Sequence, residues 1–368
     1  MLTSTLSAFK IYKKAAKKNL IDPRRASYIK LKPDDKSLVD HFFSSHLDSL
    51  EEAIEDNSFI LDCVADVAAT NFGGDQVSDS AVWQGCSPMD VDKVQSTLKQ
   101  MAREWSSDGQ AERDQSYGRI IHELVSAFPD LVQRHSVRVL VPGCGLGRLP
   151  FDLAAQGFDA QGNEFSFHML FTSSFILNHT QHRNEYRIHP YIHSFSNHRS
   201  RQNQLREVLI PDVAPPVLSQ LRETDPTIPE DGLLSMTAGS FEEIYPPADG
   251  SLFQVVATVF FIDTAPNIFK TLTSIAGSLE SGGLWINFGP LLWHYENTAP
   301  ADNNGDDYDD DRVCGFELAL DDLLQVIPKY GFEIVKHETA IPCRYTSCEP
   351  DSLGGFVYNC AFWVAKKL

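Results

Sequence analysis

The sequence has few of the features that mark disulfide-linked, zinc-binding or membrane-spanning proteins. Its 368 residues include only seven cysteines, which are spread along the chain with no C-x-x-C pair. We therefore expect reduced thiols, no zinc site and a cytoplasmic or nuclear location. No apolar run reaches the roughly 18 residues that a membrane-spanning helix needs. The first ten residues also lack the apolar core of a secretory signal.

Basic residues are scarce as well. The chain has 31 Lys and Arg against 50 Asp and Glu, which gives a formal net charge of -19 at pH 7. Nucleic acids and anionic membranes attract proteins through basic surfaces, so we expect neither as a partner. A hydrophobic content of 42% is that of an ordinary globular protein, and the length allows one large domain or two.

The N-terminus departs from this acidic balance. Residues 1–31 carry eight Lys or Arg and a single Asp. An acid-poor basic segment can be an organelle transit peptide, or it can be an amphipathic helix with a solvated basic face. The pattern favours the helix, with Phe9, Tyr12 and Leu20 on its apolar side, and we expect Pro23 to end it.

Hydrophobic periodicity divides the rest of the chain. Apolar residues recur every three to four positions in residues 34–70, 90–105 and 113–128, which predicts an N-terminal helical region over residues 1–115. Strand and helix patterns then alternate over residues 116–368, interrupted by an insertion at about 180–232 with some helix near 201–209. We predict an α/β fold, a Rossmann-like doubly wound sheet of seven strands with an antiparallel edge strand. The predicted strands are 137–141, one ending at 164, 233–238, 253–262, 284–288, 333–338 and 356–366, with a turn at 281–283.

Two polar segments could be taken for metal sites. Four histidines (182, 189, 193 and 198) lie in the insertion, but their spacing fits no ligand pair, which favours a surface or lid segment. The Asp-rich segment 301–311 could be a calcium loop. No Glu stands at the twelfth position from Asp302, so a solvated loop is favoured and we predict no metal.

A glycine-rich turn lies between the first two predicted strands. Residues 137–164, VRVLVPGCGLGRLPFDLAAQGFDAQGNE, read as a strand, a turn containing Gly143, Gly145 and Gly147, a helix and a strand ending in Glu164. Glycines allow close approach to a ligand, and an acid at the end of the second strand can bind ribose hydroxyls. The alternative is a tight turn that binds nothing. The G-x-G-x-G spacing differs from the G-x-G-x-x-G of dinucleotide binders and favours an adenosine ligand without a pyrophosphate, such as S-adenosylmethionine.

Other polar residues follow the later strands. In doubly wound sheets, ligands bind at the carboxyl ends of the strands, where the glycine turn, Ser240–Phe241 and Asp263 should converge. Asp263 could instead cap the helix that begins at Ile268. His294 follows the fifth strand, although a lone histidine is as often structural.

At these residues the sequence resembles the carnosine N-methyltransferase family, which are S-adenosylmethionine-dependent enzymes with an N-terminal helical extension. The resemblance runs from about Ser7 to Lys367. It is carried by LKQMAREWSSDGQAERD (98–114), VLVPGCGLGRLPFDLAAQGFDAQGNEFSFHMLF (139–171), FFIDTAPNI (260–268) and GGLWINFGPLLWHYEN (282–297).

The resemblance implies a site for S-adenosylmethionine. It assigns Gln100 and Arg103 to the methionine part of the cofactor and Glu164 to the ribose. The other implied cofactor-binding residues are Gly143, Gly145, Ser240, Phe241 and Val255. Ser240 and Phe241 match the pair around the adenine, and Ser240 stands where family members often have Asp.

The resemblance also implies the acceptor and the reaction. Asp263, His294 and Tyr358 match the residues that bind the dipeptide, and Tyr345 matches a second tyrosine near it. The implied activity is N-methylation of the imidazole ring of carnosine, or of a related histidine-containing dipeptide, which turns carnosine into anserine. The resemblance further suggests a homodimer.

Two other functions share part of this pattern. A methyltransferase acting on histidine in proteins or peptides would share every motif. A non-catalytic regulator that binds S-adenosylmethionine would keep Gly143 and Glu164 but lack the set of Asp263, His294 and Tyr358. The sequence contains all three members of that set, which favours an enzyme.

Overall fold

The chain divides into two compact units. The computed structural model describes residues 2–72, 85–224, 228, 233–247, 252–297, 316–345 and 352–368, so the predicted Asp-rich loop at 301–311 lies outside the described residues. The helical unit consists of Met1–Glu112, Ser166–Pro216 and Tyr345–Phe356, and the sheet unit consists of Arg113–Phe165, Val217–Arg344 and Val357–Leu368.

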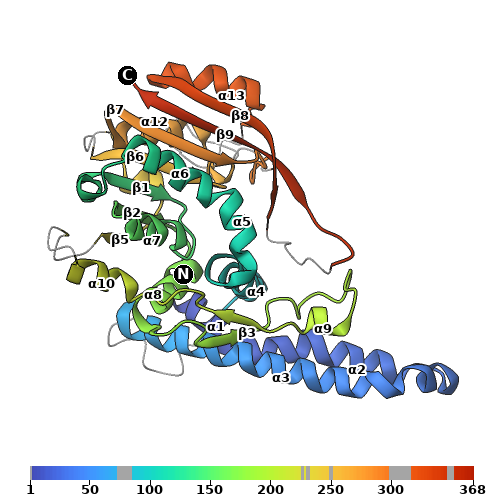
Figure 1. Cartoon of the computed structure of the whole chain (residues 1–368). Coiled ribbons are helices and arrows are strands. Elements are labelled where there is room, and N and C mark those ends of the chain that lie inside the picture. Colours follow the sequence, from blue (N-terminus) through green and yellow to red (C-terminus); the bar gives the residue numbers. More distant parts are fainter. Residues whose placement is uncertain are drawn as a thin grey trace. The chain divides into compact units, whose positions relative to one another are not determined.

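A seven-stranded sheet forms the centre of the sheet unit (Figure 1). Its order is β5 (Leu234–Ala238), β2 (Asp159–Glu164), β1 (Arg138–Pro142), β6 (Phe253–Val259), β7 (Leu279–Gly289), β9 (Val357–Lys367) and β8 (Phe332–Arg344). The first five strands are parallel, and β9 is antiparallel to both of its neighbours. The predicted doubly wound sheet is therefore confirmed. Its strand order reverses between β1 and β6.

The predicted position of the antiparallel strand is wrong. The antiparallel strand β9 lies inside the sheet, and β8 forms the edge. Burial explains the difference, because residues 360–365 of β9 are all buried while most of β8 is partly or fully exposed. The pairing of β8 with β9 shifts register twice, between Ile334 and Lys336 and between Glu338 and Ile341. Ala340, within the second shift, has a left-handed backbone with φ of 58°.

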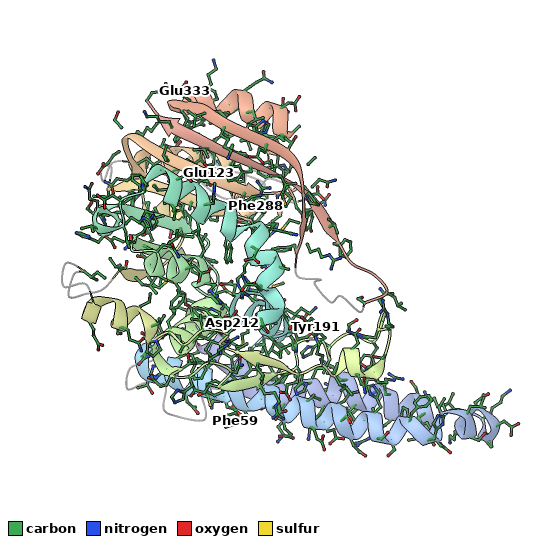
Figure 2. The ribbon with its side chains drawn as sticks, in the orientation of Figure 1. Phe59, Glu123, Tyr191, Asp212, Phe288 and Glu333 are labelled. Carbon is green, nitrogen blue, oxygen red and sulfur yellow. The ribbon has the colours of Figure 1, made fainter. Side chains whose placement is uncertain are left out.

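Helices cover both faces of this sheet. The helices α6 (Tyr117–Ala127) and α7 (Arg148–Ala155) pack on one face, in a core that includes Phe288 of β7 (Figure 2). Successive residues of β1 and β6 point into opposite cores, as alternation in a doubly covered sheet requires. The other face carries α11 (Phe241–Ile244), α12 (Ile268–Ser278) and α13 (Leu320–Val326). The sheet unit also contains α10 (Val217–Thr224), and the boundary between the two units falls within α5 (Gln110–Gln115).

Two predicted boundaries in the sheet are wrong. We expected a strand over 253–262, but β6 ends at Val259 because Phe260 adopts a left-handed backbone with φ of 51°. We expected a turn at 281–283, but β7 begins at Leu279 and runs through it, with Gly282 at φ 83°. In both places one residue has a left-handed backbone conformation, and hydrophobic periodicity does not predict such a conformation.

The helical unit confirms the predicted N-terminal helices. Its helices are α1 (Leu2–Ala16), α2 (Asp22–Ile29), α3 (Pro33–Phe72), α4 (Pro88–Trp105), α8 (Phe167–His179) and α9 (Arg201–Gln204). Pro23 does not end a helix as predicted. It lies in the first turn of α2, a position that proline favours, and a short π-helical segment at Lys17–Ile21 joins α1 to α2.

The insertion contains less helix than predicted. Only the four residues of α9 are helical near 201–209, and the chain then forms β4 (Val208–Ile210), which pairs antiparallel with β3 (Tyr186–Ile188). In the part of the chain that the structure describes, no helix combines the length and the apolar content that a membrane crossing requires. The same part contains no cluster of His, Cys, Asp and Glu side chains suited to a metal ion.

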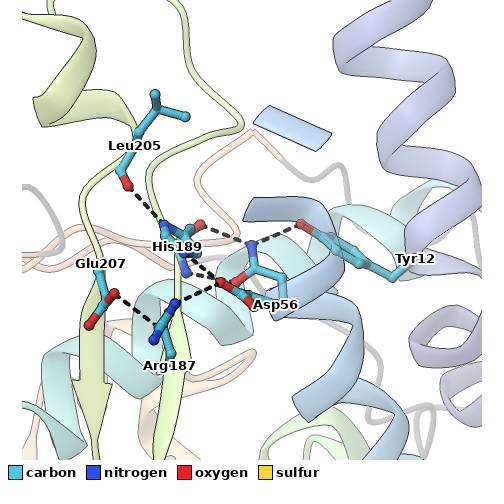
Figure 3. A network of polar contacts seen from close by, with 7 residues as sticks. Tyr12, Asp56, Arg187, His189, Leu205 and Glu207 are labelled. Atoms are coloured by element: carbon cyan, nitrogen blue, oxygen red, sulfur yellow. Dashed lines mark hydrogen bonds and ion pairs between the residues drawn. The ribbon is translucent and has the colours of Figure 1, made fainter. Parts of the chain in front are cut away.

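Two of the insertion's histidines, His189 and His193, belong to a buried polar network in the helical unit, and Figure 3 shows the part of it around His189. Asn57 of α3 is fully buried, donates to the Tyr12 hydroxyl at 3.1 Å and to the His189 carbonyl at 3.0 Å, and accepts the His189 N–H at 2.7 Å. The His189 ring lies between the Leu205 carbonyl, 2.8 Å from Nδ1, and the Asp56 carboxylate, 3.1 Å from Nε2.

The Tyr12 hydroxyl of this network also contacts His193. Burial raises the pKa of the Tyr12 hydroxyl and lowers the pKa of His193 to about 4. At neutral pH the hydroxyl therefore keeps its proton and the His193 ring is neutral, and a hydrogen bond of 2.8 Å joins the hydroxyl to Nε2 of that ring.

We expect Asn57→Ala to destabilise the protein by about 2–4 kcal/mol, since it leaves two backbone groups of His189 and the Tyr12 hydroxyl without this partner. The matched variant Tyr12→Phe deletes only the hydroxyl and should cost about 1 kcal/mol. Urea denaturation followed by circular dichroism measures both. Equal losses in the two variants would contradict a central role for Asn57.

Candidate functional site

The turn after β1 has a backbone that requires glycine. Gly143, Gly145 and Gly147 have φ of 61°, 59° and 80°, in the left-handed region that other residues seldom adopt. A Cβ added to Gly143 would lie 2.5 Å from Cδ2 of Phe261. The turn therefore passes directly against an aromatic ring from the end of β6, which excludes a side chain at this position.

The carboxylate of Glu164 lies at this turn. Its Oε2 accepts the N–H of Gly145 at 2.9 Å, and its Oε1 accepts the N–H of Phe165 at 2.9 Å. The backbone carbonyl of Glu164 accepts the N–H of Gly239, which follows β5, at 3.0 Å. The ends of β1, β2 and β5 are thus joined by hydrogen bonds, and an acidic group stands next to the glycines.

Two of the residues predicted at the adenine open α11. Phe241 is buried and meets Phe261 edge to face, with ring centroids 5.6 Å apart, so Phe261 contacts the predicted adenine residue and also closes the space above Gly143. The hydroxyl of Ser240 donates to Glu242 at 3.2 Å. Val255 lies in the middle of β6 and is fully buried in the core of the sheet.

Asp263 is a buried carboxyl group in the turn Ile262–Thr264. Its side chain is only 4% exposed and accepts the Leu292 N–H at 2.9 Å, while its backbone carbonyl accepts the His294 N–H at 3.0 Å. Burial raises the pKa of Asp263, opposed by the Leu292 N–H and by the charge of His294. The cap of α12 is Asn267, whose side chain accepts two N–H groups of the first turn. The alternative role of Asp263 as that cap is therefore wrong.

The remaining predicted acceptor residues of the sheet unit lie on two elements. His294 belongs to the turn after β7, and its side chain is exposed. Tyr358 stands in β9 opposite Cys343 of β8 and is half-buried against the core. The backbone of His294 is thus tied to Asp263, while Tyr358 is held by the β8–β9 pair.

The helical unit brings together the other three predicted residues. The side chain of Arg103 is 9% exposed, and its Nε donates to the buried carboxylate of Glu112. Its Nη1 donates to Oε1 of Gln100 at 2.8 Å, and its guanidinium carbon lies 4.1 Å from the ring centroid of Tyr345. Gln100 in turn donates to Glu104. These side chains form a paired, largely buried cluster.

Sequence reasoning missed several residues that shape these sites. Glu112 lies within the 98–114 segment, and a buried partner for Arg103 could have been sought among its acidic residues. Phe261 lies within the 260–268 segment and Leu292 within the 282–297 segment. No local pattern reveals that Phe261 packs over Gly143 or that the Leu292 N–H binds the Asp263 carboxylate.

A separate groove in the sheet unit contains none of the predicted residues. It has a volume of about 600 Å³ and lies between α6 and the strands β8 and β9. Its two strong cations are already paired, since Arg119 lies 3.0 Å from Glu338 and Lys336 binds Glu123. The groove therefore adds nothing to the predicted site.

Known proteins resemble this chain along most of its length. A family model described as carnosine N-methyltransferase matches residues 81–368. A carnosine N-methyltransferase of Schizosaccharomyces pombe is 40% identical, with 100% of this chain and 95% of that protein covered. The corresponding proteins of Mus musculus and Rattus norvegicus are 38% and 36% identical. They cover 88% and 91% of this chain, which in turn covers 76% and 78% of their lengths.

We expect Gly143→Ala to destabilise the protein by about 2–4 kcal/mol, because the new methyl group needs a left-handed backbone and displaces Phe261. Gly331→Ala is the matched control, with φ of 84° and nothing within 4 Å of an added Cβ, and should cost only about 1 kcal/mol. Thermal denaturation of the two variants measures the difference. A cost at Gly143 no larger than at Gly331 would show that the ring moves away freely.

Proposed function

The chain belongs to the carnosine N-methyltransferase family, and from that membership we propose that this methyltransferase transfers a methyl group from S-adenosylmethionine to the imidazole ring of carnosine or a related histidine-containing dipeptide. The observation that carries the proposal is the buried Asp263 carboxyl group just after β6. The neighbouring strand β1 ends in the glycine turn, and the strand order reverses between the two. Ligands of doubly wound sheets bind at such a reversal.

The residues of this chain fit S-adenosylmethionine, which when bound supplies a methyl group activated by a positively charged sulfur. Glu164 is an acceptor suited to the ribose hydroxyls, and Gly145, which has no side chain, lies directly beside its carboxylate. We assign Ser240 and Phe241 to the adenine and Val255 to the lining of the site. In the helical unit, we assign Gln100 and Arg103 to the amino-acid end of the cofactor.

Asp263 orients the acceptor. A neutral imidazole has one nitrogen with a free lone pair, which can attack a methyl carbon, and one N–H. A carboxylate that accepts the N–H selects the tautomer and directs the other nitrogen toward the methyl group. Alignment of reacting atoms at about 3 Å is the main catalytic requirement of such a displacement. We assign His294 and Tyr358 to the rest of the dipeptide.

The burial of Asp263 also favours the transition state. A carboxylate in a low-dielectric site is under-solvated, which is why burial raises the pKa of Asp263. Methyl transfer makes the imidazole cationic, so attraction to the carboxylate grows as the reaction proceeds. Because the interaction is stronger in the transition state than in the ground state, it lowers the barrier rather than merely tightening binding.

Asp263→Asn should lower kcat by about 100-fold or more, the usual effect of removing one preorganised electrostatic group. If the amide oxygen keeps the Leu292 N–H, the amide NH₂ faces the imidazole and favours the wrong tautomer. The measurement is transfer of a tritiated methyl group to carnosine. Asp322→Asn, an exposed position in α13, serves as the control and should change kcat less than twofold.

The affinity of Asp263→Asn for S-adenosylhomocysteine, measured by calorimetry, should stay within about threefold of the parent because the variant alters the acceptor side alone. Turnover close to that of the parent would remove Asp263 from the mechanism.

Glu164→Ala should weaken binding of S-adenosylhomocysteine by about 10- to 100-fold, since charge-assisted hydrogen bonds to hydroxyls contribute about 1.5–3 kcal/mol each. Calorimetric titration without acceptor isolates this effect. The control is Glu333→Gln, at an exposed position of the edge strand (Figure 2). Unchanged affinity in Glu164→Ala would exclude the ribose assignment.

A further inference from the structure

The Arg103 guanidinium is held on two edges and one face within the helical unit. Glu112 accepts the Nε–H, and Gln100 accepts a hydrogen of Nη1 at 2.8 Å. The ring of Tyr345 covers the face, with its centroid 4.1 Å from the guanidinium carbon. The hydrogen bonds fix two points in the plane of the group, and the ring limits its rotation out of that plane.

This arrangement allows a role for Tyr345 other than the acceptor contact that the family resemblance implies. A guanidinium over an aromatic face within about 6 Å is attracted by the electrons of the ring. That attraction involves the ring and does not require the hydroxyl. A Tyr that binds an acceptor by hydrogen bonding depends instead on its hydroxyl, so the two roles predict opposite effects for the loss of the oxygen and the loss of the ring.

We propose that Tyr345 is a positioning residue for the cofactor, acting through Arg103 and not through a contact with the methyl acceptor. The inference rests on the proposed function in one respect, the assignment of Arg103 to the carboxylate of the cofactor's amino-acid end. An arginine binds a carboxylate with two parallel hydrogen bonds only when its plane is correctly set. The ring of Tyr345 sets that plane.

The test compares Tyr345→Phe, which keeps the ring, with Tyr345→Leu and Tyr345→Met, which remove it. We expect Tyr345→Phe to bind S-adenosylhomocysteine within twofold of the parent protein, and the two non-aromatic variants to bind it about five- to tenfold more weakly. The KM for carnosine at saturating S-adenosylmethionine should stay within twofold in all three variants. Circular dichroism checks that each variant is folded. Two non-aromatic variants are used so that one can still be measured if the other does not fold.

A double-mutant cycle separates positioning from a general structural effect. Lysine has no planar guanidinium to orient, so Arg103→Lys should itself weaken cofactor binding. Adding Tyr345→Leu to Arg103→Lys should then cause less than a twofold further loss, whereas independent structural damage would add its full five- to tenfold effect.

Two results would overturn the proposal. One is a KM for carnosine that rises several-fold in Tyr345→Phe while cofactor affinity is unchanged, which would mark a hydroxyl contact with the acceptor. The other is unchanged cofactor affinity in Tyr345→Leu. Cofactor affinity is measured without acceptor, so a failure to methylate carnosine would refute the proposed substrate, while the affinities of Tyr345→Phe and Tyr345→Leu would still test the role of the ring.

Discussion

The hydrogen bond from the Gly145 N–H to the Glu164 carboxylate is the interaction on which the candidate cofactor site depends. Parallel pairing of β1 with β2 brings their carboxyl ends to the same edge of the sheet, and this bond then fixes an acidic group beside the glycine turn. Phe261 packs into the space that the missing Cβ of Gly143 leaves. Strand order, backbone conformation and one carboxylate therefore produce a single local arrangement at this edge of the sheet.

Each of the two units buries a charged side chain of the candidate site, Asp263 in one and Arg103 in the other, and the surroundings of the two groups differ. In the sheet unit, Asp263 is buried and accepts the Leu292 N–H. Burial raises its pKa, and a cation that forms nearby would stabilise its carboxylate. In the helical unit, Arg103 is buried with a carboxylate, an amide and an aromatic ring around it. The first group can respond to a change of charge during the reaction, whereas the second is suited to hold a fixed orientation.

The sequence predicted those parts of the fold that depend on neighbouring residues. Continuous apolar runs located the buried strands, and the glycine spacing located the turn, because both signals are local. It failed where a single residue departs from its usual behaviour, as at Phe260 with its left-handed backbone and at Pro23 within the first turn of α2. It also failed where the partner lies far along the chain. The inner position of β9, the network around Asn57 and the packing of Phe261 over Gly143 all join segments that no window of sequence contains.

The two register shifts in β8 have a consequence for how copies of this protein behave at high concentration. A long, regular edge strand offers a row of backbone groups that another molecule can pair with, which leads to aggregation. The shifts at Ile334–Lys336 and Glu338–Ile341 bend the edge, and the left-handed Ala340 interrupts its repeat. Lysine and glutamate side chains stand between the irregular points. The open side of this thirteen-residue strand is thus a poor template for intermolecular sheet growth.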